Sequence, residues 1–140
     1  MLQITTPAKS NFQIQIKKYE LNSKGKIKMG INFSHSDAHW SYHGFHDFRK
    51  RLAAEIGINL NEMQGFGGNL SWDEITDPIV SLLNKSDLEG ELSSQECAST
   101  APRLRELISE WQEGYDKYHG LSLADGMESC ALLDEVFEFC

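Results

Sequence analysis

Four of the protein's five histidines fall in one short polar and aromatic stretch. With a neighbouring aspartate they form a candidate metal-ligand set of His35, Asp37, His39 and His43, and His46 follows closely. Zinc takes three or four nitrogen, oxygen or sulfur ligands, so this set predicts a metal-binding module or a zinc metalloenzyme. The HExxH signature of metalloproteases is absent. The alternative interpretation is a group of solvent-exposed or helix-capping histidines, including a pH-sensitive interface.

Residues 85–96 have the skeleton of an EF-hand calcium loop, with Asp87, Glu89 and Glu96 at three of the ligand positions. The first loop position, normally an aspartate, is Lys85, whose ammonium group removes one oxygen ligand and repels a cation. The stretch therefore predicts either a calcium-responsive module or a plain helix–loop–helix in which a serine near its end caps the second helix.

Charge is unevenly distributed along the chain. There are 13 Lys and Arg residues against 21 Asp and Glu residues, a formal net charge of −8. Residues 1–60 hold nine basic and four acidic residues, whereas residues 61–140 hold four basic and seventeen acidic residues. Such a negative C-terminal part repels nucleic-acid phosphates and attracts basic protein surfaces. The alternative is a charge that serves solubility and needs no partner.

Motifs of covalent or nucleotide chemistry are not evident. Cys97, Cys130 and Cys140 form no CxxC pair, which disfavours a disulfide framework and indicates a reducing compartment. The glycines of 65–68 lack the GK[ST] of a phosphate-binding loop and predict a turn. No apolar run approaches the ~18–20 residues of a membrane helix, and residues 1–10 do not resemble a signal peptide. We therefore expect a cytoplasmic protein without a membrane segment.

The strands and helices expected from the sequence predict an α+β fold in a single domain, residues 1–140. Apolar and polar residues alternate over 12–16 and over 27–33, with turn residues between them. This pattern predicts an N-terminal antiparallel β-hairpin. Residues 136–140 can add a short strand to it, while the helices follow the hairpin instead of alternating with strands.

Four or five helices are expected to pack against this hairpin or small sheet, including a helix–loop–helix at about 75–112. The predicted helices are 45–56, 75–83, a helix around 104–111 that Pro102 kinks or starts, and 122–133. Ser122 and Asp125 resemble a capping box that opens the last helix. The stretch before the first helix, residues 35–44, is interpreted as a loop.

Several segments of the C-terminal half resemble a known family. They are Asp77–Val80, Leu82–Asn84, Ser86–Leu92, Glu96–Cys97, Ala101–Leu107 and Leu123–Glu128. Together they are similar to an uncharacterised family of small bacterial proteins. The resemblance implies a bacterial or phage setting and no known chemistry, and the N-terminal hairpin lies outside it.

The leading hypothesis is a non-enzymatic interaction module of inhibitor or immunity type. It would act on a basic enzyme surface through an acidic face formed by residues 87–96 and 106–116. Aromatic side chains would anchor the contact. The candidate partner-binding residues are Trp40, Tyr42, Trp72, Asp87, Glu89, Glu91, Glu106, Glu110 and Glu113. This function needs no cofactor; zinc and calcium belong to the two alternatives.

Overall fold

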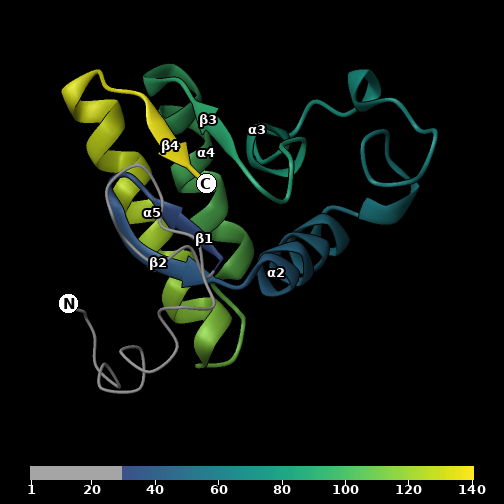
Figure 1. Cartoon of the computed structure of the whole chain (residues 1–140), viewed down its shortest axis with the longest axis horizontal. Coiled ribbons are helices and arrows are strands. Elements are labelled where there is room, and N and C mark those ends of the chain that lie inside the picture. The colour runs from purple at the N-terminus through teal and green to yellow at the C-terminus, as the bar shows by residue number, and fades with distance from the viewer. Residues whose placement is uncertain (1–29) are drawn as a thin grey trace, which may run out of the picture.

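A four-stranded antiparallel sheet with the strand order β2-β1-β4-β3 forms the centre of the fold. The computed structural model describes residues 30–140. Its strands are β1 (Ile31–Phe33), β2 (Ser36–Trp40), β3 (Gly90–Leu92) and β4 (Phe137–Phe139). Its α-helices are α2 (Tyr42–Glu55), α3 (Val80–Leu83), α4 (Ser94–Ile108) and α5 (Tyr115–Leu133). Figure 1 shows the sheet lying across α4 and α5, which confirms the predicted α+β class.

Strand β1 coincides with the last part of the strand predicted over 27–33. Ile31 and Phe33 are buried and the residue between them is half-buried, as the alternation of apolar and polar residues predicts. The short C-terminal strand predicted within 136–140 is also present, as β4, and it pairs with both β1 and β3. The other predicted strand, 12–16, lies outside the described residues.

The loop predicted over 35–44 is wrong. Ala38 and Trp40 point into the core from strand β2, and β2 pairs with β1 so that Trp40 faces Ile31. Helix α2 begins directly after this strand, because the Ser41 side chain accepts a hydrogen bond from the Gly44 N–H and caps it. The polar and aromatic composition obscured a period-2 burial pattern that only its pairing partner reveals.

Helix α4 runs without interruption through Pro102. Buried Ala101 and Leu104 continue one apolar stripe across the exposed proline, so tertiary packing outweighs the lost hydrogen bond. At the start of α4, Ser93 and Glu96 form a complete capping box. The predicted serine cap of a second helix after the 85–96 loop is therefore confirmed.

Two other helix boundaries differ from the prediction. Helix α5 begins at Tyr115 and not at Ser122, whose backbone oxygen instead accepts a hydrogen bond from the Ser36 hydroxyl of β2. Helix α3 begins only at Val80, because the Asp77 carboxylate accepts the Ile79 N–H in a turn before it. Within residues 30–140, no helix is both long and apolar enough to cross a membrane.

Candidate protein-interaction site

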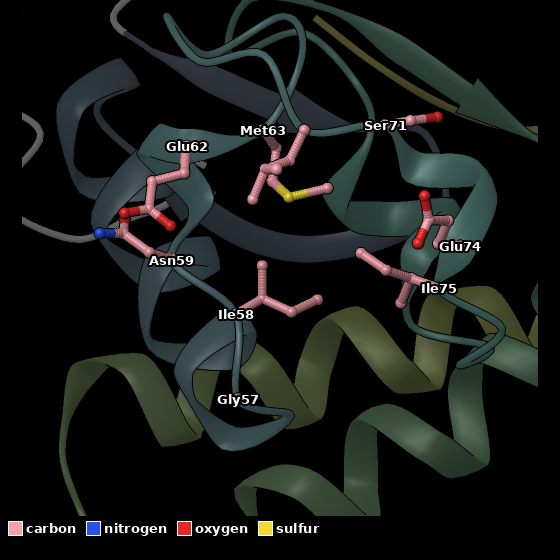
Figure 2. Close-up of a pocket in the computed structure, with 9 residues that line it drawn as sticks. Gly57, Ile58, Asn59, Glu62, Met63, Ser71, Glu74 and Ile75 are labelled. Carbon is pink, nitrogen blue, oxygen red and sulfur yellow. The ribbon is translucent and has the colours of Figure 1, made fainter.

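A cavity of about 250 Å³ opens in the long connection between α2 and α3. Its lining residues are Gly57, Ile58, Asn59, Glu62, Met63, Leu70, Ser71, Glu74 and Ile75. Figure 2 shows Ile58, Met63 and Ile75 between two acidic side chains, Glu62 on one side and Glu74 on the other. The site therefore combines an apolar floor with an acidic rim.

One wall of this cavity is a short closed loop. A 3₁₀ turn, η2 (Leu60–Glu62), is capped by the Asn59 side chain and leads into an isolated bridge between Met63 and Leu70. Gly68 allows the closure, because a Cβ there would lie 2.1 Å from the carbonyl carbon and oxygen of Glu62. The glycine-rich stretch thus serves as a tight turn, as its sequence predicts.

The opposite wall is held to this loop by Trp72. Its indole N–H donates to the Gln64 carbonyl oxygen at 2.9 Å, and its ring meets Phe66 edge-on. A second 3₁₀ turn, η3 (Trp72–Glu74), starts here with Ser71 as its cap. Trp72, predicted as a partner anchor, is half-buried and positions the acidic residue Glu74 at the cavity.

The rim of the cavity is acidic and exposed. Glu62 and Glu74 are exposed, and no cation among residues 30–140 forms a salt bridge with either carboxylate. Asp73, next to Glu74 in the chain but not on the cavity lining, is exposed as well. Leu70, on the lining, keeps 55 % of its surface exposed. An exposed apolar side chain beside exposed carboxylates is suited to a ligand that is both aliphatic and cationic.

Arg49 of α2 is the centre of a hydrogen-bond network that lies next to this loop. Its side chain is fully buried and donates from Nη1 to the carbonyl oxygens of Leu82 (3.2 Å) and Lys85 (2.7 Å), and from Nη2 to Asp87. Burial lowers the pKa of Arg49, and the Asp87 carboxylate opposes that shift. His46 lies 3.1 Å from both Asp87 oxygens. The network ties α2 to the segment that follows α3.

The calcium-ligand candidates of the 85–96 loop make separate contacts within the fold. Asp87 holds Arg49 and His46, and Glu96 accepts the Ser93 N–H within the capping box of α4. Glu89 is exposed and precedes β3. A calcium ion would therefore have to compete with a buried guanidinium for Asp87. The calcium alternative stays a prediction.

The histidines of the predicted zinc site each contact a different residue. His35 Nε2 lies 2.9 Å from Glu135, while the Nδ1 of His39 lies 3.1 Å from the Asn32 amide oxygen. His43 is exposed on α2 and pairs with Asp47 at 3.4 Å. Over residues 30–140, no group of three or more histidine, cysteine, aspartate or glutamate side chains is placed to hold a metal ion. The zinc alternative also stays a prediction.

A fifth histidine, His119, which the sequence did not single out, lies against β2. Its Nδ1 accepts the backbone N–H of His39 at 3.1 Å, and its ring stacks on Tyr115 at 4.0 Å. Burial lowers the pKa of His119, the neighbouring His39 lowers it further, and Asp116 acts in the opposite direction. The accepted hydrogen bond requires an unprotonated Nδ1, so geometry and pKa both favour the neutral ring.

This neutral histidine predicts a pH-dependent stability. Because the folded-state pKa lies below the unfolded value of about 6.5, the unfolded chain binds the proton first as pH falls. The free energy of unfolding is therefore expected to decrease as pH drops through and below about 6.5. Urea unfolding at a series of pH values should show a weaker dependence in His119→Asn, whose amide oxygen can accept the same hydrogen bond. An unchanged pH profile in this variant would contradict the assignment.

Two of the three cysteines, Cys97 and Cys130, are not placed as nucleophiles, whereas Cys140 is exposed. Cys97 and Cys130 are buried between α4 and α5, and burial raises the pKa of Cys97 to about 12 and also raises that of Cys130. Both thiols therefore stay protonated near neutral pH. This agrees with their interpretation as small apolar residues of the core.

The chain matches no family model, no curated protein and no solved structure. The site is therefore interpreted from its own geometry.

The acidic face predicted from residues 87–96 and 106–116 is divided by helix α4. The first segment lies at the start of this helix and the second at its end, about 20 Å away for a helix of this length. Glu106 forms a salt bridge with Arg103 at 2.6 Å and Glu113 with Lys117 at 3.4 Å, and both are exposed, as are Glu89, Glu91 and Glu110. The structure thus shows two separate acidic areas and no single face.

Two of the predicted aromatic anchors are engaged within the fold. Trp40 is only 2 % exposed, and its indole N–H donates to Asp116 at 3.0 Å, so its assignment as a surface anchor is wrong. It lies on β2, which buries alternate residues, and stacks on Phe48 of α2. Tyr42 is half-buried against the core at the start of α2.

Sequence reasoning missed Glu62, Asp73 and Glu74. The available signal was the pair of acidic segments that flank the glycine-rich turn, each next to an apolar residue that lines the cavity. The distance along the chain between Glu62 and Glu74 concealed the fact that both line one cavity.

Proposed function

We propose that this protein is a small acidic interaction module of bacterial or phage origin, acting in the cytoplasm as an inhibitor or immunity-type protein. Its partner would be an enzyme with a basic surface. The observation that supports the proposal is the cavity between α2 and α3, where Glu62 and Glu74, which pair with no cation among residues 30–140, flank an apolar floor that includes exposed Leu70.

The mechanism follows from charge and shape. Net charge of −8 steers a basic surface toward the protein and accelerates association. Once docked, the apolar residues of the cavity exclude water and slow dissociation. Occupying the basic surface, where an enzyme of anionic substrates holds its substrate, blocks the reaction.

The test uses a basic enzyme recovered with the immobilised protein from a bacterial lysate and then purified. We expect the association rate constant, measured by stopped flow, to fall about tenfold or more from low to high ionic strength. We also expect stoichiometric addition of the protein to inhibit the enzyme. Association that does not depend on salt, or binding without inhibition, would contradict the proposed function.

A further inference from the structure

We infer that the cavity between α2 and α3 binds one arginine side chain of the basic partner. The inference rests on the proposed function, since it names the chemical group that the acidic module would recognise. Figure 2 shows the arrangement, with carboxylates on two sides and apolar side chains between them.

The apolar floor suits the stem of an arginine. Ile58, Met63 and Ile75 lie between the two acidic walls, and Met63 itself is 1 % exposed, so the floor is part of the packed structure. Long basic side chains bury their methylene groups along such surfaces while the charged head stays near polar atoms. The cavity volume of about 250 Å³ gives the stem and head room to enter.

The acidic walls suit a guanidinium. Glu62 and Glu74 come from different 3₁₀ turns and lie on opposite sides of the cavity, with the Glu62 carboxylate beside Asn59 at its edge (Figure 2), and neither has a cationic partner among the described residues. A guanidinium carries five N–H donors in a planar fork and can reach acceptors in several directions at once. A lysine ammonium is a compact, more strongly hydrated charge, and entering an apolar cavity is less favourable for it.

The loop that carries the site is held in place by the protein itself. The bridge between Met63 and Leu70 closes it, and the Trp72 indole fastens its second wall to Gln64. His46, anchored to Asp87, lies 3.2 Å from the Asn61 amide oxygen at the base of η2. Because the loop around the cavity is already ordered, less conformational entropy is lost when a ligand binds there.

The experiment is a titration of the ¹⁵N-labelled protein with the peptide N-acetyl-Gly-Arg-Gly-amide, followed by backbone amide shifts. Matched peptides with lysine or with citrulline, the neutral analogue of arginine, serve as comparison ligands. We expect saturable shifts at Ile58, Asn59 and Met63 with the arginine peptide, weaker binding of lysine, and about tenfold weaker binding of citrulline.

Two protein variants with equal loss of charge complete the test. Glu62→Gln/Glu74→Gln is expected to weaken arginine binding about tenfold. The control, Glu89→Gln/Glu91→Gln, removes two exposed acids elsewhere and should bind as the wild type does. Shifts outside the cavity, equal binding of lysine or citrulline, or equal effects of the two variants would overturn the inference.

The arginine site and the proposed function can fail independently of each other in these experiments. A purified basic enzyme that binds with salt dependence and is inhibited equally by wild type and Glu62→Gln/Glu74→Gln would overturn the arginine site alone. Conversely, specific arginine binding in the cavity, together with binding of the enzyme that causes no inhibition, would support the site and contradict the proposed function.

Discussion

Replacing Asp87 by asparagine is expected to lower the free energy of unfolding by about 3 kcal/mol. The Arg49 guanidinium is fully buried, and among residues 30–140 Asp87 is its only salt-bridge partner. Removing that carboxylate charge leaves the buried cation with uncharged neighbours, the carbonyl oxygens of Leu82 and Lys85 and the rings of Phe45 and Phe66 at 4.5 Å and 5.3 Å. Losing one partner of a buried pair typically destabilises a protein by ~3–5 kcal/mol, and the 35 % exposure of the Asp87 side chain places this case at the lower end.

Urea unfolding monitored by tryptophan fluorescence measures this effect. The control is Asp47→Asn on the exposed surface of α2, which should change stability by less than ~0.5 kcal/mol. The double variant Arg49→Met/Asp87→Asn should be more stable than Asp87→Asn alone, because it removes the unpaired buried charge together with its partner. A wild-type stability for Asp87→Asn would contradict the stabilising role assigned to the Asp87 charge.

Replacing Gly126 by alanine is expected to destabilise the protein by about 2 kcal/mol, although alanine is the better helix former. Gly126 lies buried in α5, where the helix meets the turn between β1 and β2. A Cβ at this position would lie 2.7 Å from the His35 carbonyl oxygen and 2.8 Å from the Ser36 Cβ. Since one of the nearest atoms is backbone, the helix and the hairpin must move apart, which disturbs the packing around both.

A matched substitution on the same helix separates this clash from helix propensity. Ser129→Ala lies on the exposed side of α5 and should leave the melting temperature unchanged or slightly raised. Gly126→Ala should lower the melting temperature by roughly 5 °C or more for a domain of this size. A rise in both variants would mean that α5 does not approach the β1–β2 turn as closely as the structure shows.

Local patterns in the sequence were sufficient for several elements. The alternation that ends at Phe33 and the short C-terminal segment 136–140 became β1 and β4. The spacing of Leu104, Leu107 and Ile108 matched the buried stripe of α4. These features depend on contacts between residues a few positions apart, which spacing alone encodes. Strand β2 was not predicted in this way, because its alternation of buried and exposed side chains becomes clear only when it pairs with β1.

The chain by itself thus determined its charge balance, its α+β class, the cap of α4 and the turn at residues 65–68. Only the tertiary structure decided which acidic residues lie exposed and which are engaged inside the fold. In the folded chain, Asp87 binds Arg49, which lies 38 positions earlier, and Glu62 and Glu74 line one cavity. The physical reason is that short-range spacing sets local conformation, whereas the pairing of distant charges and the shape of a cavity depend on the path of the folded backbone.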